Sequence, residues 1–141
     1  MRGLFLAACQ STPDSIQAEL NTEFILAPGQ SANISATGLT LRLVGVTGDD
    51  RCPSGVECAM SGPVTVQISV EADSFSPAEI ILQTFTGKDG RAPGGQFEGI
   101  QDRIKVGGFE IRVAAVLPYP QGFGASIKER DYRVSFVVTE K

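Results

Sequence analysis

The sequence predicts an all-β domain, folded as a two-sheet antiparallel β-sandwich with immunoglobulin-like or Greek-key connections. After residue 22, apolar and polar residues alternate with a period of two through most of the chain. Turn signals rich in Gly and Pro separate these alternating segments at short intervals. Helical periodicity is weak throughout, and only residues 126–130 (S-I-K-E-R) could form a helical turn. With 42% apolar residues, the 141-residue chain has enough for one packed core.

We expect about eight strands, at residues 23–27, 32–36, 39–47, 64–72, 79–86, 100–106, 109–117 and 132–138. Residues 73–77 should form a turn, and Gly107-Gly108 should close a two-residue hairpin. Three strands have a well-marked apolar face that should be buried. Its members are Val64, Val66, Ile68, Val70 and Ala72; Phe109, Ile111, Val113, Ala115 and Leu117; and Tyr132, Val134, Phe136 and Val138.

The N-terminal segment predicts a lipid anchor. Leu6-Ala7-Ala8-Cys9 looks like a bacterial lipobox, in which a Cys becomes the acylated N-terminus of the mature protein. Residues 1–8 would then be part of a signal peptide; their apolar run is short, so we infer that the natural signal continues upstream of Met1. Residues 9–21 would be the lipidated Cys9 and a polar tether, and residues 22–141 the β-sandwich domain. The alternative is a short apolar N-terminus with an incidental Cys.

Composition narrows the classes of function. The formal charge is −4, and the basic residues are scattered among acids, so we expect no nucleic-acid partner. The chain has no His, which removes the commonest general base and metal ligand. We therefore expect a protein that is not an enzyme and needs neither cofactor nor metal.

One motif stands out: Asp50-Arg51-Cys52-Pro53-x-x-Val56-x-Cys58, followed by Gly62. It resembles a family of uncharacterised bacterial secreted lipoproteins with the pattern D-S-R-C-P-x-x-V-x-C-x-W-x-G. The resemblance spans roughly residues 24–138. Looser pieces add to it, namely P-G-Q-S-A at 28–32 before L-T-L at 39–41, and P-Y-P at 118–120 before D-Y at 131–132. Here Asp49 precedes Asp50 without the usual Ser, and Met60 stands in place of Trp. The family implies export and a β domain, but no established activity.

The two Cys of the motif are expected to form a disulfide. Disulfides persist outside the reducing cytosol, and a cross-linked loop of this size gains roughly 2–2.5 kcal/mol in the chain-entropy model. A redox role would favour the spacing C-x-x-C, and zinc would need four ligands. Calcium could take oxygens from Asp49, Asp50 and Glu57, although the alternating ligand pattern of a calcium loop is missing.

Three weaker patterns have ordinary explanations. Residues 87–91 (G-K-D-G-R) lack the order of a phosphate-binding loop and read as a surface loop. Glu79, Glu98, Asp102 and Glu110 could include a catalytic carboxylate pair, but they fit the solvated faces of strands. Asn33 begins an N-I-S sequon that falls within a strand.

Residues 117–125 (L-P-Y-P-Q-G-F-G-A) form the second loop of interest, because aromatic side chains among Pro and Gly suit a contact with a partner. The alternative is that the aromatic side chains fold back as a lid over the core. The candidate contact residues in the two loops are Asp50, Arg51, Pro118, Tyr119, Pro120 and Phe123.

The sequence thus favours a non-enzymatic lipoprotein attached through Cys9 to the cell envelope, on its periplasmic or cell-surface side. Its partners would be the membrane and another protein, and its role that of a binding module or accessory subunit of a surface assembly. The alternative is an exported inhibitor or stress protein that binds a soluble enzyme through its end loops.

Overall fold

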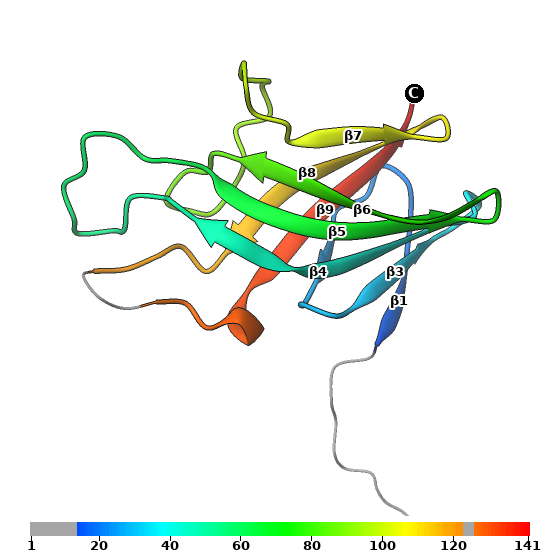
Figure 1. Ribbon diagram of the computed structural model, residues 1–141, viewed down its shortest axis with the longest axis horizontal. Helices are drawn as coiled ribbons and strands as arrows, with labels where there is room; N and C mark the ends of the chain where they lie inside the picture. Colours follow the sequence, from blue (N-terminus) through cyan, green and yellow to red (C-terminus); the bar gives the residue numbers. More distant parts are fainter. Residues whose placement is uncertain (1–13, 123–125) are drawn as a thin grey trace, which may run out of the picture.

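The computed structural model describes residues 14–122 and 126–141, which form two β-sheets packed face to face (Figure 1). The first sheet has the order β1-β3-β4-β5-β6, with β1 Ser15–Ala18, β3 Ser31–Ile34, β4 Leu39–Asp49, β5 Val64–Ala72 and β6 Phe75–Thr84. The second has the order β2-β9-β8-β7, with β2 Phe24–Leu26, β9 Arg133–Glu140, β8 Phe109–Leu117 and β7 Arg103–Val106. All neighbours are antiparallel except β1 and β3, so the predicted β-sandwich is confirmed.

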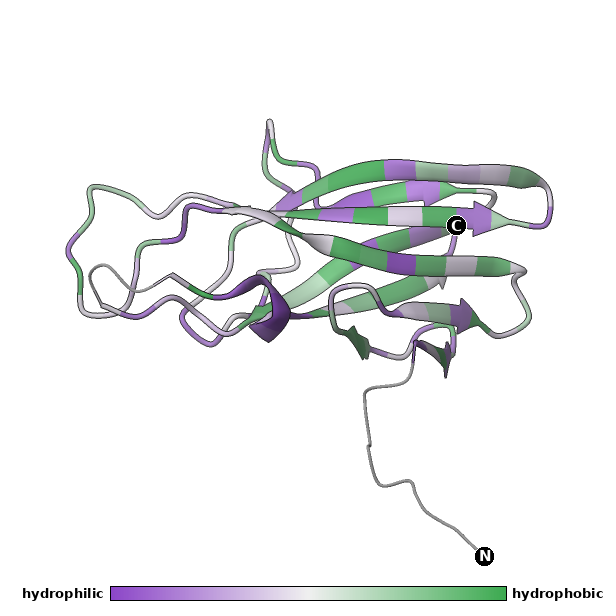
Figure 2. Cartoon of the chain, turned by 60° about the horizontal axis from the view of Figure 1, so that its bottom comes forward, coloured by the Kyte–Doolittle hydropathy of each residue, from purple (hydrophilic) through white to green (hydrophobic). Residues whose placement is uncertain are grey.

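The core lies between the two sheets and is built from the alternating apolar faces of their strands. The alternation is visible along the long strands in Figure 2. Side chains such as Leu41, Ile68, Val113 and Phe136 have no exposed surface. Burial of each such side chain contributes about 1.5–3 kcal/mol before chain entropy is subtracted.

Several predicted elements are confirmed closely. The strand expected at residues 64–72 is β5, Val64–Ala72, and four of its five expected core residues are fully buried. The last strand, β9, buries Val134, Phe136 and Val138 as expected, and Tyr132, just before its start, is buried too. Gly107 and Gly108, with φ of 55° and 86°, form the turn between β7 and β8.

The sheet begins earlier than the predicted domain start at residue 22. β1, which lies in the segment expected to be a tether, pairs in parallel with β3 from Ser15 to Ala18, and Ala18 is only 5% exposed. β1 is a short edge strand with mixed burial, so its sequence S-I-Q-A carries too few residues to show a period. Residues 9–13, including Cys9, lie outside the described residues.

The turn predicted at residues 73–77 is shorter than expected. β6 starts at Phe75, which pairs with Ala72, so that only Asp73 and Ser74 connect the two strands. Pro77 lies inside β6, where the sequence suggested a break. Pro is tolerated there because β6 is the edge strand of its sheet and its outer side needs no ladder hydrogen bond.

The inward face of β8 changes partway along the strand. A β-bulge between Val113 and Ala115 inserts one residue, and the side chains beyond it swap faces. Val116 therefore joins the core with no exposed surface, whereas Leu117, predicted to be buried, is 43% exposed.

Helical structure among the described residues is limited to a 3-10 turn at Glu129–Asp131, within and just beyond the predicted helical turn. None of the described residues belongs to a helix with the length and hydropathy needed to cross a bilayer.

Candidate functional site

Three long loops lie at one end of the sandwich, and short turns lie at the other. β4 and β6 end, and β5 begins, at the same level of the first sheet, since Val64 pairs with both Asp49 and Thr84. β8 ends beside the start of β9, where Leu117 pairs with Arg133. The loops 50–63 and 85–102 and the described segments 118–122 and 126–132 consequently meet at this end, which we call the loop end. The first of them projects from it (Figure 1).

The predicted disulfide is present. The sulfurs of Cys52 and Cys58 are 2.13 Å apart and the two Cα atoms 6.0 Å apart. Cys58 is exposed and Cys52 half-buried, so the cross-link lies in the surface loop rather than in the core. The loop is also hydrogen-bonded to the neighbouring loop, because Ser54 N donates to Pro120 O at 2.9 Å and Gly122 N donates to Ser54 O at 2.9 Å.

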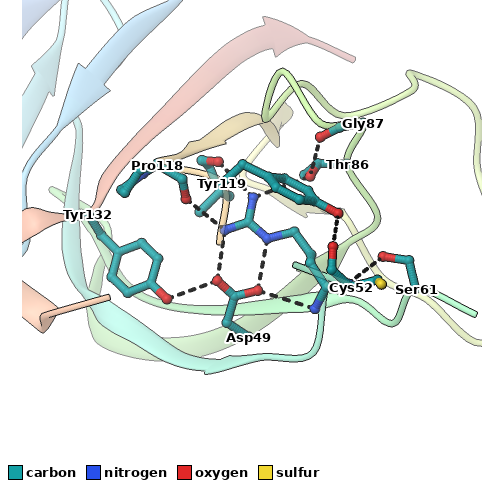
Figure 3. A network of polar contacts seen from close by, with 10 residues as sticks. Asp49, Cys52, Ser61, Thr86, Gly87, Pro118, Tyr119 and Tyr132 are labelled. Carbon is teal, nitrogen blue, oxygen red and sulfur yellow. Dashed lines mark hydrogen bonds and ion pairs between the residues drawn. The ribbon is translucent and has the colours of Figure 1, made fainter. Parts of the chain in front are cut away.

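A buried guanidinium lies beneath residues 50–63, which we call the disulfide loop. The side chain of Arg51 has no exposed surface. It pairs bidentately with Asp49, with Nε 2.8 Å and Nη2 2.7 Å from the two carboxylate oxygens. Nη1 donates to Val116 O at 2.8 Å and to Thr86 Oγ1 at 3.2 Å, and Nη2 also donates to Pro118 O at 3.1 Å (Figure 3). Arg51 thus links β4 to β8 of the opposite sheet and to loop 85–102.

All five N–H groups of Arg51 are engaged in these contacts, which decides what the group can do. A guanidinium that binds an anionic ligand must offer free donors toward solvent, and here every donor is used within the chain. Arg51 is therefore a structural cross-link between the sheets.

The carboxylate of Asp49 is shared between two donors. Tyr132 Oη donates to Oδ2 at 2.8 Å, on the oxygen that also accepts from Arg51. Burial alone would raise the pKa of Asp49, but the hydrogen bonds from Arg51 and Tyr132 together hold it below its ordinary value. Burial, with the adjacent Asp49 carboxylate, raises the pKa of Tyr132. Because of these shifts, Asp49 stays ionised and Tyr132 stays protonated near neutral pH.

Tyr119 folds back onto this cluster. It is only 7% exposed, and its ring centroid lies 5.1 Å from Cζ of Arg51, a cation–π distance. Its hydroxyl donates to Cys52 O at 2.5 Å. Tyr119 is thus folded back onto the domain, as in the alternative that the sequence left open. Its hydrogen bond to Cys52 joins residues 118–122 to the disulfide loop.

The structure divides the predicted contact residues. Arg51 and Tyr119 are buried, and their side chains complete the charged cluster. Asp50 and Pro118 are exposed, and Pro120 is half-buried. Phe123 lies outside the described residues.

Comparison with known proteins finds no matching family model, no matching curated protein and no matching solved structure.

Sequence reasoning missed Asp49 as the partner of Arg51 and weighed it only as a calcium oxygen. The signal was available, because residues two apart in a strand project to the same side and an Asp-x-Arg spacing allows an ion pair.

The other acids weighed for catalysis lie on the surface or pair with basic groups. Glu79 and Glu98 are exposed. Asp102 pairs with Arg103 at 2.7 Å, and this hydrogen-bonded ion pair raises the pKa of Arg103. Glu110 lies 3.7 Å from Lys141. Within residues 14–122 and 126–141, no group of three or more His, Cys, Asp or Glu side chains could hold a metal ion.

Arg91, from the Gly-rich loop, forms a second ion pair that stays on the surface. Its guanidinium bonds both oxygens of Glu23 at 3.1 and 2.7 Å, next to β2. The hydrogen bond from Arg91 lowers the pKa of Glu23. The Arg91 side chain is 53% exposed, so solvent screens this pair and it contributes little to stability.

Proposed function

We propose that the chain is an exported lipoprotein, tethered to a membrane surface by acyl chains on Cys9, that acts without catalysis as a binding module or accessory subunit of a surface assembly. The observation that carries this proposal is the disulfide-closed loop at one end of the sandwich. A disulfide is retained in oxidising compartments outside the cytosol. Two acyl chains on one terminal residue hold a domain stably at a bilayer.

The loop end is the proposed contact surface. The internal cross-links of Arg51 and Tyr119 fix the loops, so that a partner meets a preformed surface and little entropy is lost on binding. Met60 is 80% exposed on this surface. Met is among the residue types that are enriched in the buried centres of protein interfaces.

The second candidate function is an exported inhibitor that acts on a soluble enzyme through the same loops. The specific observation in its favour is that Met60 lies in a covalently restrained segment, two residues after Cys58. A restrained, protruding segment suits insertion into the groove of another protein.

Fractionation of native cells and mass spectrometry of the mature N-terminus test the tether. We expect an acylated Cys9 and membrane association, both lost in Cys9→Ser. Co-purification from native membranes separates the two roles, because a subunit gives a stoichiometric partner and an inhibitor captures an enzyme transiently. An acyl-free chain in the cytosol, with reduced Cys52 and Cys58, would refute the proposal.

A further inference from the structure

We infer that residues 58–62 (C-A-M-S-G) bind a serine endopeptidase of the extracytoplasmic space, with the side chain of Met60 in an apolar primary pocket, and inhibit it as a very slow substrate. This inference deepens the inhibitor role proposed above. It rests on the loop end as a contact surface and does not depend on the lipid anchor.

Met60 is the most exposed large apolar side chain in the described part of the chain, at 80%. The next are Ile25 at 55% and Ile81 at 50%, and both belong to strands. Met is unbranched and has three rotatable bonds, so it fills deep apolar slots readily. The primary pocket of chymotrypsin-type peptidases is such a slot, whereas that of trypsin-type peptidases carries an acid and selects basic side chains.

Both flanks of Met60 are attached to one residue, Cys52. On the N-terminal side, Cys58 is bound to it through the disulfide. On the C-terminal side, Ser61 Oγ accepts a hydrogen bond from Cys52 N at 3.0 Å. One residue further, Gly62 N donates to Asp50 O at 2.9 Å, which joins the segment to the end of β4.

Cys52 is itself fixed to the body of the domain. Its carbonyl accepts the hydrogen bond of buried Tyr119, and its neighbour Arg51 is cross-linked to both sheets (Figure 3). The conformation of the segment is therefore set when the protein folds, and binding to a groove does not have to order it.

The same attachments distinguish an inhibitor from a substrate. Hydrolysis of the Met60–Ser61 peptide bond consumes one water and yields a Met60 carboxylate and a Ser61 amine. In a flexible chain the two new ends separate and leave the groove. Here the Met60 end stays attached through Cys58, two residues away, and the Ser61 end through its hydrogen bond with Cys52. The two ends therefore remain close together, and the peptide bond can re-form with release of one water before either end dissociates.

A peptidase also needs room around the segment. The disulfide loop projects from the loop end (Figure 1), and a shallow open hollow of about 660 Å³ lies beside it, lined among others by Met60, Lys88 and Tyr119. The rim of a substrate groove can enter this space without displacing a strand.

The test uses the purified, oxidised full chain, titrated against chymotrypsin, subtilisin and trypsin with chromogenic peptide substrates. We expect tight competitive inhibition of at least one of the first two and none of trypsin. Met60→Lys should weaken that inhibition by at least about 100-fold and transfer it to trypsin, because the lysine matches an acidic pocket. The matched control Ile81→Lys, which changes an exposed apolar side chain on β6, should leave the inhibition unchanged.

Removing an attachment should convert the inhibitor into a substrate. Ser61→Ala deletes the acceptor for Cys52 N, and a double Cys52→Ala, Cys58→Ala variant deletes the disulfide. In variants that keep the circular dichroism of the wild type, we expect cleavage between Met60 and Ser61 at least about tenfold faster, read by mass spectrometry.

Three outcomes would overturn the inference: no inhibition of chymotrypsin or subtilisin by the folded wild type, inhibition that survives Met60→Lys, or cleavage that falls elsewhere. The acylation of Cys9 is measured independently. If these tests fail but the chain is acylated and membrane-bound, the peptidase inhibitor is refuted, and the proposed role as a tethered binding module is not.

Discussion

Replacing Asp49 with Asn tests whether the buried charged cluster holds the loop end onto the sandwich. The substitution keeps the size of the side chain and one acceptor oxygen, but removes its charge. Arg51, with no exposed side-chain surface, is then left as a buried cation without its counter-charge. One hydrogen bond of the bidentate pair is also lost, and the remaining oxygen cannot serve both Arg51 and Tyr132 fully.

Removing one partner of a buried ion pair costs about 3–5 kcal/mol. Asp49 is 12% exposed, and the amide still accepts one hydrogen bond, so we expect the lower end, about 3 kcal/mol. For a domain of this size the unfolding entropy near the midpoint is roughly 0.26 kcal/mol per degree, so Tm should fall by about 12 °C.

Thermal and urea unfolding followed by circular dichroism measure this change, with Asp50→Asn as the matched control. Asp50 is the adjacent residue, is exposed, and undergoes the same chemical change. We expect its free energy of unfolding to stay within about 0.5 kcal/mol of the wild type. Equal losses for the two variants would refute the assignment of Asp49 as the partner of Arg51.

The pH dependence of the free energy of unfolding gives a second test of Asp49→Asn. The pKa of Asp49 is lowered in the folded state, so the unfolded chain binds the proton first as pH falls. The stability from Asp49 is complete above its unfolded pKa of about 3.9 and is lost as pH falls through the folded pKa. The gap between the wild type and Asp49→Asn should therefore be constant near neutral pH and shrink below about pH 4. A gap that widens toward acid would contradict this assignment.

Three further predictions follow from local geometry. In Gly62→Ala the new Cβ would lie 2.8 Å from Asp50 Cβ and 3.0 Å from Asp50 O, so the backbone must shift. We expect the free energy of unfolding, measured in urea, to fall by about 1–3 kcal/mol. The control Gly95→Ala, whose new Cβ has nothing within 4 Å, should leave it unchanged. Thiol titration of the denatured, unreduced exported protein should find neither Cys52 nor Cys58 free, and reduction should lower the free energy of unfolding by about 2.4 kcal/mol. Arg91→Ala removes an exposed ion pair and should cost under about 1 kcal/mol, with a difference that fades at 1 M salt; a larger, salt-independent loss would mean that the side chain packs rather than pairs.

The strands that the sequence predicted well are those with enough residues to display a period. β5 has nine residues and alternates without interruption, so its bounds and its buried face both follow from the pattern. β1 has four residues and owes its conformation to pairing with β3, which no local pattern encodes. The outer half of β8 failed for a different reason, because the β-bulge before Ala115 reverses the faces without any change in composition.

In the charged cluster of Asp49, Arg51 and Tyr132, some contacts likewise follow from the local sequence and others depend on the fold. The pairing of Asp49 with Arg51 is a local property, readable from their spacing. Tyr132 is 83 residues from Asp49 in the sequence, and Pro118 is 67 residues from Arg51. These contacts exist because the second sheet brings the end of β8 and the start of β9 beside the end of β4. They could be found only once the pairing of strands was known.

Most of the distinctive side chains in residues 49–62 have structural roles, which narrows the set of residues available for contact with a partner. Asp49 and Arg51 are used in joining the sheets, the two Cys in closing the loop, and Gly62 in allowing the close approach of Asp50. These side chains are accounted for by the fold, so their presence says nothing about a partner. Met60 is different, because it is 80% exposed in a segment that the disulfide from Cys58 and the hydrogen bond at Ser61 attach to Cys52. A single exposed apolar side chain is common on protein surfaces, so the exposure of Met60 does not by itself point to a partner. The titration of Met60→Lys against chymotrypsin and trypsin decides whether the proposed peptidase pocket receives this side chain.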